Sequence, residues 1–424
     1  MILSEKHASL RLLAYKAFNL IMAGYAVIVT ARLLFTAILN VSQWQSFELT
    51  DHLINYQGGY VRRGLLGELI FQISQTFSSD PRIAIFLICL IAFISTIVIF
   101  ITQFKKQHLC YWVLPLNICL GGAVFLRKDF LCLLSIIAIL AIFRRIQSNV
   151  VRNILISLIL VVGINLHECV FFIIVPFITL LIWYGSKDVK SKITRLMWIS
   201  IPYISFLLVS LFKGDANTAQ SVHDSWQIAA MGKTPASTIS SLSWDTVNTI
   251  LFHIRKNFFT PSYGVYGIIS KPIVWAMTII LIPNILFLNQ TESNTDLISK
   301  KYVFLKVLIF QFFSLLPMLL ILSCDLSRIM FYWTSSAIVI YLFIPSFYLN
   351  SIFPQWYGRI YEKIVPIVYN TKARILSIAL LPIICISPYF TKLDKAFECS
   401  CIGSYLSLCE YGIKTIEYLL AMVK

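Results

Sequence analysis

Charged residues are scarce in this chain, and their scarcity decides its class. Only 13% of the 424 residues are Asp, Glu, Lys or Arg, whereas ordinary soluble domains carry ~25%. Hydrophobic residues make up 58%. Apolar runs of roughly 17–25 residues recur along most of the sequence, and each is long enough to cross a ~30 Å hydrocarbon core as a helix. The composition excludes an ordinary soluble domain and predicts an integral membrane protein.

Three further patterns are missing. The apolar runs do not alternate with polar residues, which excludes a transmembrane barrel. The ten cysteines form no C-x-x-C or paired Cys/His spacing, so we expect no metal site. The first apolar run ends in no A-x-A-like cleavage site, so we expect it to be a retained span. The net charge of +16 is typical of the cytoplasmic loops of membrane proteins, and we expect no nucleic-acid partner.

The apolar runs predict an all-α, polytopic bundle of about eleven transmembrane helices. We place one transmembrane domain over 1–390 and an amphipathic tail over 391–424. Two long segments outside the spans, 41–82 and 213–271, contain amphipathic pieces that we expect to lie along the interface or cover a cavity. The expected spans are 17–40, 83–104, 110–126, 130–143, 153–166, 169–184, 196–212, 272–289, 302–323, 329–349 and 375–390.

The distribution of Lys and Arg favours a cytoplasmic N-terminus. With that orientation the inner segments hold 18 basic residues and the outer segments 15, of which five lie in the long loop 213–271. Long loops count little in the positive-inside rule. The assignment requires the stretch 153–184 to form a tight hairpin that turns at Asn165-Leu166-His167-Glu168. A single crossing would put the next basic segment outside, against the bias.

The first charged motif follows the first span. It runs through Asp51, then Gly58-Gly59-Tyr60, then Arg62-Arg63. Glycines allow a backbone to approach a ligand closely, and paired arginines offer forked donors that suit phosphate oxygens. We interpret the motif as a site for a lipid pyrophosphate. The alternative is a surface loop whose arginines meet lipid head groups.

Two further motifs join the same predicted face. Arg127-Lys128-Asp129 occupies a very short turn, which is either part of the substrate site or a solvated hairpin whose Asp129 neutralises a neighbour. Asp325 and Arg328 are three residues apart, so they either pair with each other or place Arg328 in the anionic site.

The pair His167-Glu168 interrupts an otherwise apolar stretch. Glu168 is a candidate general base, and His167 could orient it or a substrate hydroxyl. The alternative is a polar pair that stabilises the hairpin. Position 171 is Phe, so the H-E-x-x-H signature of zinc hydrolases is absent. Aromatic faces with carboxylates suit sugars, and the long loop offers both; the alternative is an ordinary amphipathic loop. Its polar residues His223, Asp224, Asp245, His253, Arg255 and Lys256 are interspersed with Trp226, Trp244 and Tyr263.

Together these motifs resemble a group of bacterial polytopic proteins of surface-polysaccharide gene clusters, the O-antigen polymerase (Wzy) type. The resemblance rests on the run 55–68, which reads Asn-Tyr-Gln-Gly-Gly-Tyr-Val-Arg-Arg-Gly-Leu-Leu-Gly-Glu, and on the later motifs in the same order up to Arg328. It implies a glycosyltransferase of the inner membrane that moves an oligosaccharide from undecaprenyl pyrophosphate onto another repeat at the periplasmic face.

The resemblance also implies site residues and partners. It implies no metal or other cofactor. Membrane lipids, a chain-length regulator and a flippase would be its partners. The long loop has only Arg255 among arginines, whereas such polymerases have arginine-rich loops, so the anion binders would lie elsewhere. The resemblance gives a catalytic role to Glu168, His167 or Asp51, and substrate contacts to Arg62, Arg63, Arg127, Lys128, Asp129, Asp325, Arg328, Tyr60, Gly58 and Gly59.

Two other functions remain open. Glycosyltransferases of the GT-C type, which use polyprenyl-phosphate sugars, resemble this chain in hydropathy and place acidic residues in the first outer loop. Glu48 and Asp51 would then be the catalytic carboxylates. A transporter or flippase of lipid-linked sugars would use a similar basic cavity without bond chemistry, but it predicts internal repeats and charges near the bilayer midplane. No internal repeat is visible in the sequence.

Overall fold

The computed structural model describes residues 2–115, 125–184, 188–235, 237–259, 264–289, 295–323, 325–353, 355–380 and 401–410. Within these ranges every regular element is a helix and no strand occurs, so the predicted all-α class is confirmed.

The helices follow one another with short connections. In the first half they are α1 (Ile2–Ser42), α2 (Phe47–His52), α3 (Gly64–Phe77), α4 (Pro81–Gln107), α6 (Asp129–Arg145), α7 (Asn149–Leu166), α8 (Cys169–Tyr184) and α9 (Val189–Leu211). In the second half they are α10 (Ala216–Ser225), α11 (Ser237–Ser240), α12 (Thr246–Phe258), α13 (Gly264–Leu286), α14 (Thr295–Pro317), α15 (Leu326–Phe343), α16 (Ser346–Ile352), α17 (Gln355–Val368) and α18 (Thr371–Leu380).

Five of the described helices are long and apolar enough to cross a membrane. They match the expected spans 17–40, 83–104, 153–166, 196–212 and 302–323. Their bounds are Lys16–Ser42, Pro81–Gln107, Asn149–Leu166, Lys192–Leu211 and Ser299–Leu322. A sixth span results if α15 and α16 are counted together, although the chain bends by 115° between them.

The other expected spans are shorter or only partly described. The spans 130–143, 169–184 and 272–289 coincide with α6, α8 and the apolar part of α13, Lys271–Leu286. About half of the residues of α6 and more than half of those of α8 are buried, so these helices do not need the length of an isolated span. The expected spans 110–126 and 375–390 lie partly outside the described residues.

The predicted hairpin at Asn165–Glu168 is confirmed. Helix α7 ends at Leu166 and α8 begins at Cys169. Helix α9 packs against both of them. Two hydrogen bonds between α7 and α9 show the relative direction of these helices. Ser157 of α7 donates to the Trp198 carbonyl oxygen at 2.8 Å, and Asn165 donates to Ser205 at 3.2 Å, so α7 and α9 run in the same direction. The chain must therefore return along α8.

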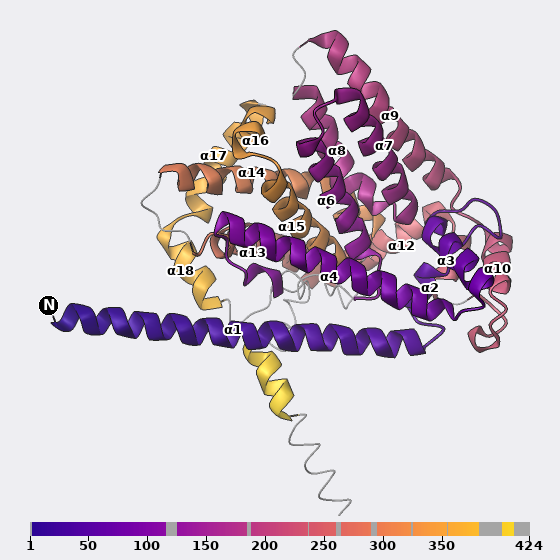
Figure 1. Ribbon diagram of the computed structural model, residues 1–424, viewed down its shortest axis with the longest axis horizontal. Coiled ribbons are helices and arrows are strands. Elements are labelled where there is room, and N and C mark those ends of the chain that lie inside the picture. The colour runs from indigo at the N-terminus through magenta and orange to yellow at the C-terminus, as the bar shows by residue number, and fades with distance from the viewer. Residues whose placement is uncertain are drawn as a thin grey trace, which may run out of the picture.

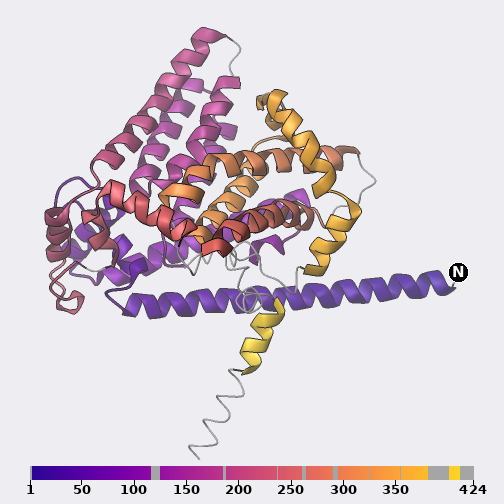
Figure 2. The same cartoon turned by 180° about the vertical axis from the view of Figure 1, so that it is seen from behind.

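The helices form layers around α15. Helices α6 to α9 run side by side, α4 crosses near their lower ends, and α1 runs below α4 (Figure 1). Helices α12 and α13 cross the opposite face (Figure 2). The described part of the C-terminal tail, 401–410, is helical, and its Tyr405 hydroxyl donates to the Ile21 carbonyl oxygen of α1 at 2.8 Å.

The expected loop 213–271 is mostly helical. It contains α10, α11 and α12 and two short 3-10 turns, Ala229–Met231 and Ser241–Ser243. Helix α13 begins at Gly264, and its apolar part, Lys271–Leu286, starts close to the expected beginning of the next span at 272. The segment lies at the end of the molecule where α9 finishes and α15 begins.

Candidate functional site

Five segments far apart in the sequence bring their charges together at one end of the helices. They are the end of α2, the loop before α3, the turn before α6, the break between α7 and α8, and the start of α15. Each of these segments carries one of the motifs that we singled out in the sequence. The expectation that the motifs share one face is therefore met by the geometry.

Arg63 lies at the centre of this cluster. Its Nε donates to Oε2 of Glu168 at 2.8 Å, and its Nη2 also bonds to Oε1, so the guanidinium grips the carboxylate with two donors. Its Nη1 lies 3.4 Å from Oδ1 of Asp51. Arg63 adopts a left-handed backbone conformation with φ 63°, which a non-glycine residue rarely does. Such strain persists only where neighbouring contacts fix the residue, and it concentrates at functional sites.

Asp51 and Lys128 lie beneath Arg63. The Nζ of Lys128 is 3.6 Å from Oδ2 of Asp51 and donates to the Arg63 carbonyl oxygen at 3.2 Å. Lys128 is fully buried and Asp51 almost so. Burial alone would raise the pKa of Asp51, but Lys128 and Arg63 together hold it well below its usual range. Asp51 is therefore a charged support for Arg63 rather than a group that faces a substrate.

A second ion pair joins α6 to α15. The Nε of Arg328 is 2.5 Å from Oδ1 of Asp129, and the hydroxyl of Tyr332 donates to the same oxygen. Asp129 is fully buried. Asp129 thus neutralises Arg328, not one of its sequence neighbours as the solvated-hairpin interpretation held.

Asp325 does not pair with the Arg328 guanidinium. Its carboxylate accepts from the backbone N–H of Arg328 at 3.4 Å, as an N-terminal cap of α15. It also pairs with Arg127, whose Nη1 is 2.6 Å away, while Glu48 lies 3.5 Å from the Nη2 of Arg127. Of the two alternatives, the pairing of Asp325 with Arg328 is therefore not found, and two pairs that cross between helices take its place.

His167 and Glu168 form the turn between α7 and α8. The Nδ1 of His167 accepts from the backbone N–H of Cys169 at 3.2 Å, so in the neutral ring the proton sits on Nε2. That Nε2 is buried and has no partner among the described residues. Burial and the charge of Arg63 lower the pKa of His167. Burial would raise the pKa of Glu168, but the charge of Arg63 and its hydrogen bonds hold it well below its usual range. At neutral pH His167 is uncharged and Glu168 is ionised.

A cavity of about 470 Å³ opens beside this cluster. The segment 213–258 forms one wall, with residues such as Trp244, Phe252 and His253. Apolar residues of α8, α9 and the π-helical turn Met318–Leu322 form another. The charged residues that line it are Arg62, Arg63, Lys213, Lys256 and Arg328, with only Glu168 and Asp325 of opposite charge. The cavity therefore presents an excess of positive charge.

The predicted site residues divide into two groups. Those that line the cavity are Arg62, Arg63, His167, Glu168, Asp325 and Arg328. Those outside its lining are Asp51, Gly58, Gly59, Tyr60, Arg127, Lys128 and Asp129. The second group includes the supports of the first, since Asp51 and Asp129 bind Arg63 and Arg328.

The glycine-rich turn packs against protein. A Cβ on Gly58 would lie 2.9 Å from the Thr218 carbonyl oxygen of α10, so glycine is needed for the approach of that helix. Tyr60 donates to Asn165 at 2.7 Å and packs its ring against Phe212. The turn thus joins α10 and the hairpin and does not face the cavity. This differs from the direct phosphate contact expected for Gly58, Gly59 and Tyr60.

Two functional candidates escaped the sequence analysis. Tyr332 lines the cavity and bonds to Asp129, and its only signal in the sequence is its position one turn after Arg328. Lys213 lies at the end of α9 and donates to the Trp244 carbonyl oxygen at 3.0 Å, which fixes the covering segment. Across the described residues, no group of three or more His, Cys, Asp or Glu side chains gathers as a metal ion would need.

The fold and the site define a helical protein with several candidate membrane spans and an ion-paired, positively charged cavity at one end. The chain matches no protein-family model, no curated protein and no solved structure.

His52 gives the site a pH dependence that can be measured. Burial and the charge of Lys128 lower its pKa to about 4, from an ordinary value of 6.5. As the pH falls from 6.5 to 4, the unfolded chain takes up a proton that the folded chain does not, so stability is lost in this window. A shift of this size corresponds to about 3 kcal/mol. We expect the thermal midpoint in detergent to fall between pH 7 and pH 4.5.

The thermal midpoint of the His52→Gln variant should fall less than that of the parent over the same pH range. Glutamine keeps a donor for the Leu126 carbonyl oxygen, which the His52 Nε2 meets at 2.6 Å, but it does not titrate. His167 continues to contribute in both proteins because its pKa is lowered too. If the thermal midpoint falls equally with pH in the variant and the parent, His52 is not the cause of this pH dependence.

Proposed function

We propose that this protein is a membrane glycosyltransferase of the polysaccharide-polymerase type. It transfers a glycan from undecaprenyl pyrophosphate to the end of an acceptor repeat, at the periplasmic face of a bacterial inner membrane. The observation that carries the proposal is the cavity beside Arg63, with its excess of cations, its apolar wall and donors that have no partner among the described residues.

The cations suit a pyrophosphate. Arg62 makes no ion pair with a carboxylate in the described part of the chain, and its guanidinium reaches only the Ser241 carbonyl oxygen at 3.1 Å. Arg328 leaves its Nη2 buried and without a partner, as His167 leaves its Nε2. A buried donor without a partner costs roughly 1–3 kcal/mol, which a ligand oxygen would recover. Arg328 belongs to α15 and His167 to the hairpin. One anion that accepts hydrogen bonds from both residues would connect these two elements.

The apolar wall suits the lipid part of the substrate. Phe172, Phe206 and Met318 line one side of the cavity, and Trp244 and Phe252 belong to the covering segment. Phe171 and Phe206 stack with ring centroids 4.0 Å apart, which makes this wall rigid. An isoprenoid chain would lie against the first side, and sugar rings would stack on the second. A free nucleotide sugar would not use the apolar wall.

Glu168 is the candidate base. Both of its oxygens are held by Arg63, and a carboxylate in this state is a weak base. A donor pyrophosphate competes for the Arg63 guanidinium and releases Glu168. The acceptor hydroxyl then gives its proton to Glu168 and bonds to the anomeric carbon. The bond between that carbon and the pyrophosphate oxygen breaks, and the arginines neutralise the departing undecaprenyl pyrophosphate.

The alternatives find less support. The GT-C interpretation needs Glu48 and Asp51 as catalytic carboxylates, but both lie outside the cavity lining and are engaged with Arg127, Lys128 and Arg63. A transporter predicts charges near the middle of the spans. Here the charges gather at helix ends, where α7 stops and where α6 and α15 start. The proposed orientation, with a cytoplasmic N-terminus, and the proposed partners, a flippase and a chain-length regulator, follow from the polymerase proposal.

Arg62→Ala tests the proposal in the native cell. Because Arg62 has no carboxylate partner among the described residues, its loss should leave the fold intact, and the protein should accumulate to the level of the parent. We expect long-chain polysaccharide to disappear from a gel of the extracted glycolipid, leaving single repeats.

Arg82→Ala is the matched control, since Arg82 lies in the first turn of α4, outside the cavity lining, where it pairs with Asp80 and stacks over Trp44. Its ladder should be normal. A normal ladder in Arg62→Ala would refute the anion-binding role. Loss of one sugar from the repeat in place of the ladder would favour a single-sugar transferase.

A further inference from the structure

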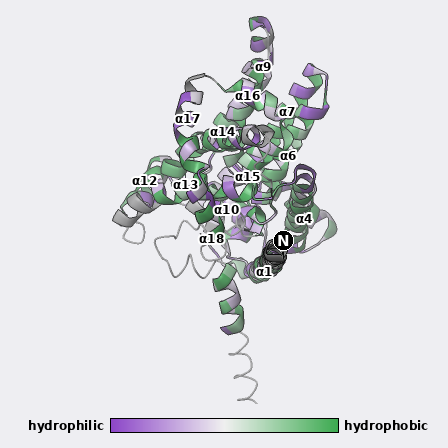
Figure 3. Cartoon of the chain, turned by 90° about the vertical axis from the view of Figure 1, so that its left-hand side faces the viewer, coloured by the Kyte–Doolittle hydropathy of each residue, from purple (hydrophilic) through white to green (hydrophobic). Residues whose placement is uncertain are grey.

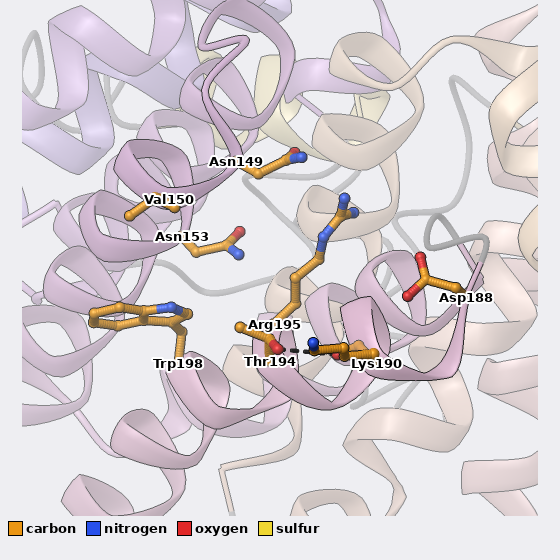
Figure 4. Close-up of a pocket in the computed structure, with 8 residues that line it drawn as sticks. All are labelled: Asn149, Val150, Asn153, Asp188, Lys190, Thr194, Arg195 and Trp198. Atoms are coloured by element: carbon orange, nitrogen blue, oxygen red, sulfur yellow. Dashed lines mark hydrogen bonds between the residues drawn. The ribbon is translucent and has the colours of Figure 1, made fainter.

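A second cavity lies at the opposite end of α7 and α9 from the charged cluster. Its volume is about 330 Å³, within the range of small-ligand sites. It is lined by Asn149, Val150, Asn153, Asp188, Lys190, Thr194, Arg195 and Trp198 (Figure 4). None of these residues belongs to the site described above.

Both helices begin at this cavity. Helix α7 starts at Asn149 and α9 at Val189, so the free backbone N–H groups of two long helices gather here. The positive ends of both helix dipoles favour an anion at this place. Hydrophilic residues mark the tips of α7 and α9, in contrast to the hydrophobic bodies of the neighbouring helices (Figure 3).

The side chains add positive charge and an unused amide. Arg195 extends its guanidinium into the same space toward which Asn153 points its amide (Figure 4). Asn153 is only 4% exposed, and no described residue bonds to its side chain. Arg152 lies near enough to Arg195 for their charges to oppose each other, and its Nε is buried without a partner. Like charges held together with unused donors indicate a place for an anion.

We propose that this cavity binds the phosphate of an anionic membrane lipid. Arg195 would pair with the phosphate oxygens, the Asn153 amide would donate to one of them, and the ring of Trp198 would lie along the glycerol region. Arg195 is the principal contact because a guanidinium binds phosphate with two parallel bonds.

The surfaces beside the cavity are apolar and exposed, which points to a lipid as the carrier of the phosphate. Val150 lines the cavity, and Ile154 and Leu158 follow it at intervals of one helical turn along α7. On α9, Ile193 and Met197 also lie one helical turn apart, and more than half of each residue is exposed. Acyl chains would lie along these two stripes once the phosphate is held between the helix tips.

Native mass spectrometry of the full chain, purified and delipidated in detergent, tests the proposal. The probes are dioctanoyl phosphatidylglycerol, dioctanoyl phosphatidylcholine and inorganic phosphate. We expect phosphatidylglycerol to bind at least about tenfold more tightly than phosphatidylcholine, a difference of about 1.4 kcal/mol, because choline brings a positive charge toward the arginines. Inorganic phosphate should compete only weakly, since it lacks the acyl chains.

Two variants and one control complete the test. Arg195→Gln keeps the size of the side chain and removes its charge, and Asn153→Ala removes the amide. We expect both to weaken phosphatidylglycerol binding, Arg195→Gln by about tenfold or more. Arg145→Ala, an exposed arginine at the same end but outside the cavity lining, should bind as the parent does.

Three results would overturn the proposal. The first is equal binding of the two lipids, and the second is unchanged binding in Arg195→Gln. The third is full competition by inorganic phosphate at the concentration of the lipid, because the site would then take a free anion and not a lipid. Thermal midpoints of the variants show whether each is folded, and Asn153→Ala still decides the matter if Arg195→Gln is not.

Discussion

Replacing Arg328 with glutamine should lower the free energy of unfolding by about 3–5 kcal/mol, because it leaves the buried carboxylate of Asp129 without a cation. Asp129 is fully buried, and among the described residues only the Arg328 guanidinium and the Tyr332 hydroxyl bond to its carboxylate. No water can take the place of the lost guanidinium without entering the packed region between α6 and α15. The expected result is a large fall in the thermal midpoint of the detergent-purified protein and poor accumulation in the membrane.

The double variant Asp129→Asn/Arg328→Gln separates the charge from the shape. It keeps both side-chain sizes and removes both charges, so most of the lost stability should return. Tyr332→Phe removes one hydrogen bond to Asp129 and should cost about 1–3 kcal/mol. Arg82→Gln breaks an exposed pair and should cost at most about 1 kcal/mol. If the double variant is as unstable as Arg328→Gln alone, the two residues are not coupled and the pair is not the reason for the loss.

The hairpin shows what the sequence could predict. Polar residues in the stretch Asn165–Glu168 interrupt an apolar run that is too long for one span and too short for two. Backbone groups at such a break need polar partners or protein around them, which restricts where the turn can lie. The basic residues after the run then fixed its direction. The structure places the break between Leu166 and Cys169, within the predicted stretch.

The partners inside the charged cluster could not be predicted. The motifs contain the residues that come together, but they do not show that Arg63 pairs with both Asp51 and Glu168. That arrangement depends on how the loop at 51–63 lies against a turn more than 100 residues away. The sequence left local pairs open, such as Asp325 with Arg328, because residues three apart on a helix are close. In the fold these local pairs gave way to Arg328 with Asp129 and Arg127 with Asp325.

The number of spans exposes another limit. Hydropathy cannot distinguish a helix that faces lipid from one buried among other helices, since both are apolar. Helix α8 is almost as apolar as any span, yet it has 16 residues and packs most of its surface against its neighbours. The bend of 115° after α15 was also missed in the run 329–349, although Pro345 at the break is a signal for it.

His167→Asn should abolish most of the turnover while leaving the fold as stable as that of the parent. The two ring nitrogens have different tasks. Nδ1 accepts from the backbone N–H of Cys169 and caps the start of α8, whereas Nε2 of this cavity-lining residue is buried and has no partner among the described residues. Asparagine places its side-chain oxygen close to the position of Nδ1, so the cap survives. The donor at Nε2 is lost, and with it the hydrogen bond that we propose for the departing pyrophosphate.

The size of the effect follows from the task of the lost donor. Removing one donor that meets charge developing in a transition state typically costs about 10²–10³ in kcat. His167→Gln places its amide N–H near the position of Nε2 and should keep turnover within about tenfold of the parent, but it loses the cap and some stability. We therefore expect His167→Asn to have a low rate and a normal thermal midpoint, and His167→Gln to have a nearly normal rate and a lowered thermal midpoint. Rates are measured as the formation of long chains from purified lipid-linked repeats.

His52→Asn is the matched control for this pair, because His52 is also a buried, neutral histidine but does not line the cavity. It should lose stability through its bond to Leu126 and keep the rate per folded molecule. Should His167→Asn turn over as fast as the parent, the free Nε2 of His167 has no part in the reaction. If His167→Asn instead loses both stability and rate, the histidine only stabilises the hairpin. Only a stable protein with a slow reaction agrees with a buried donor that awaits the substrate.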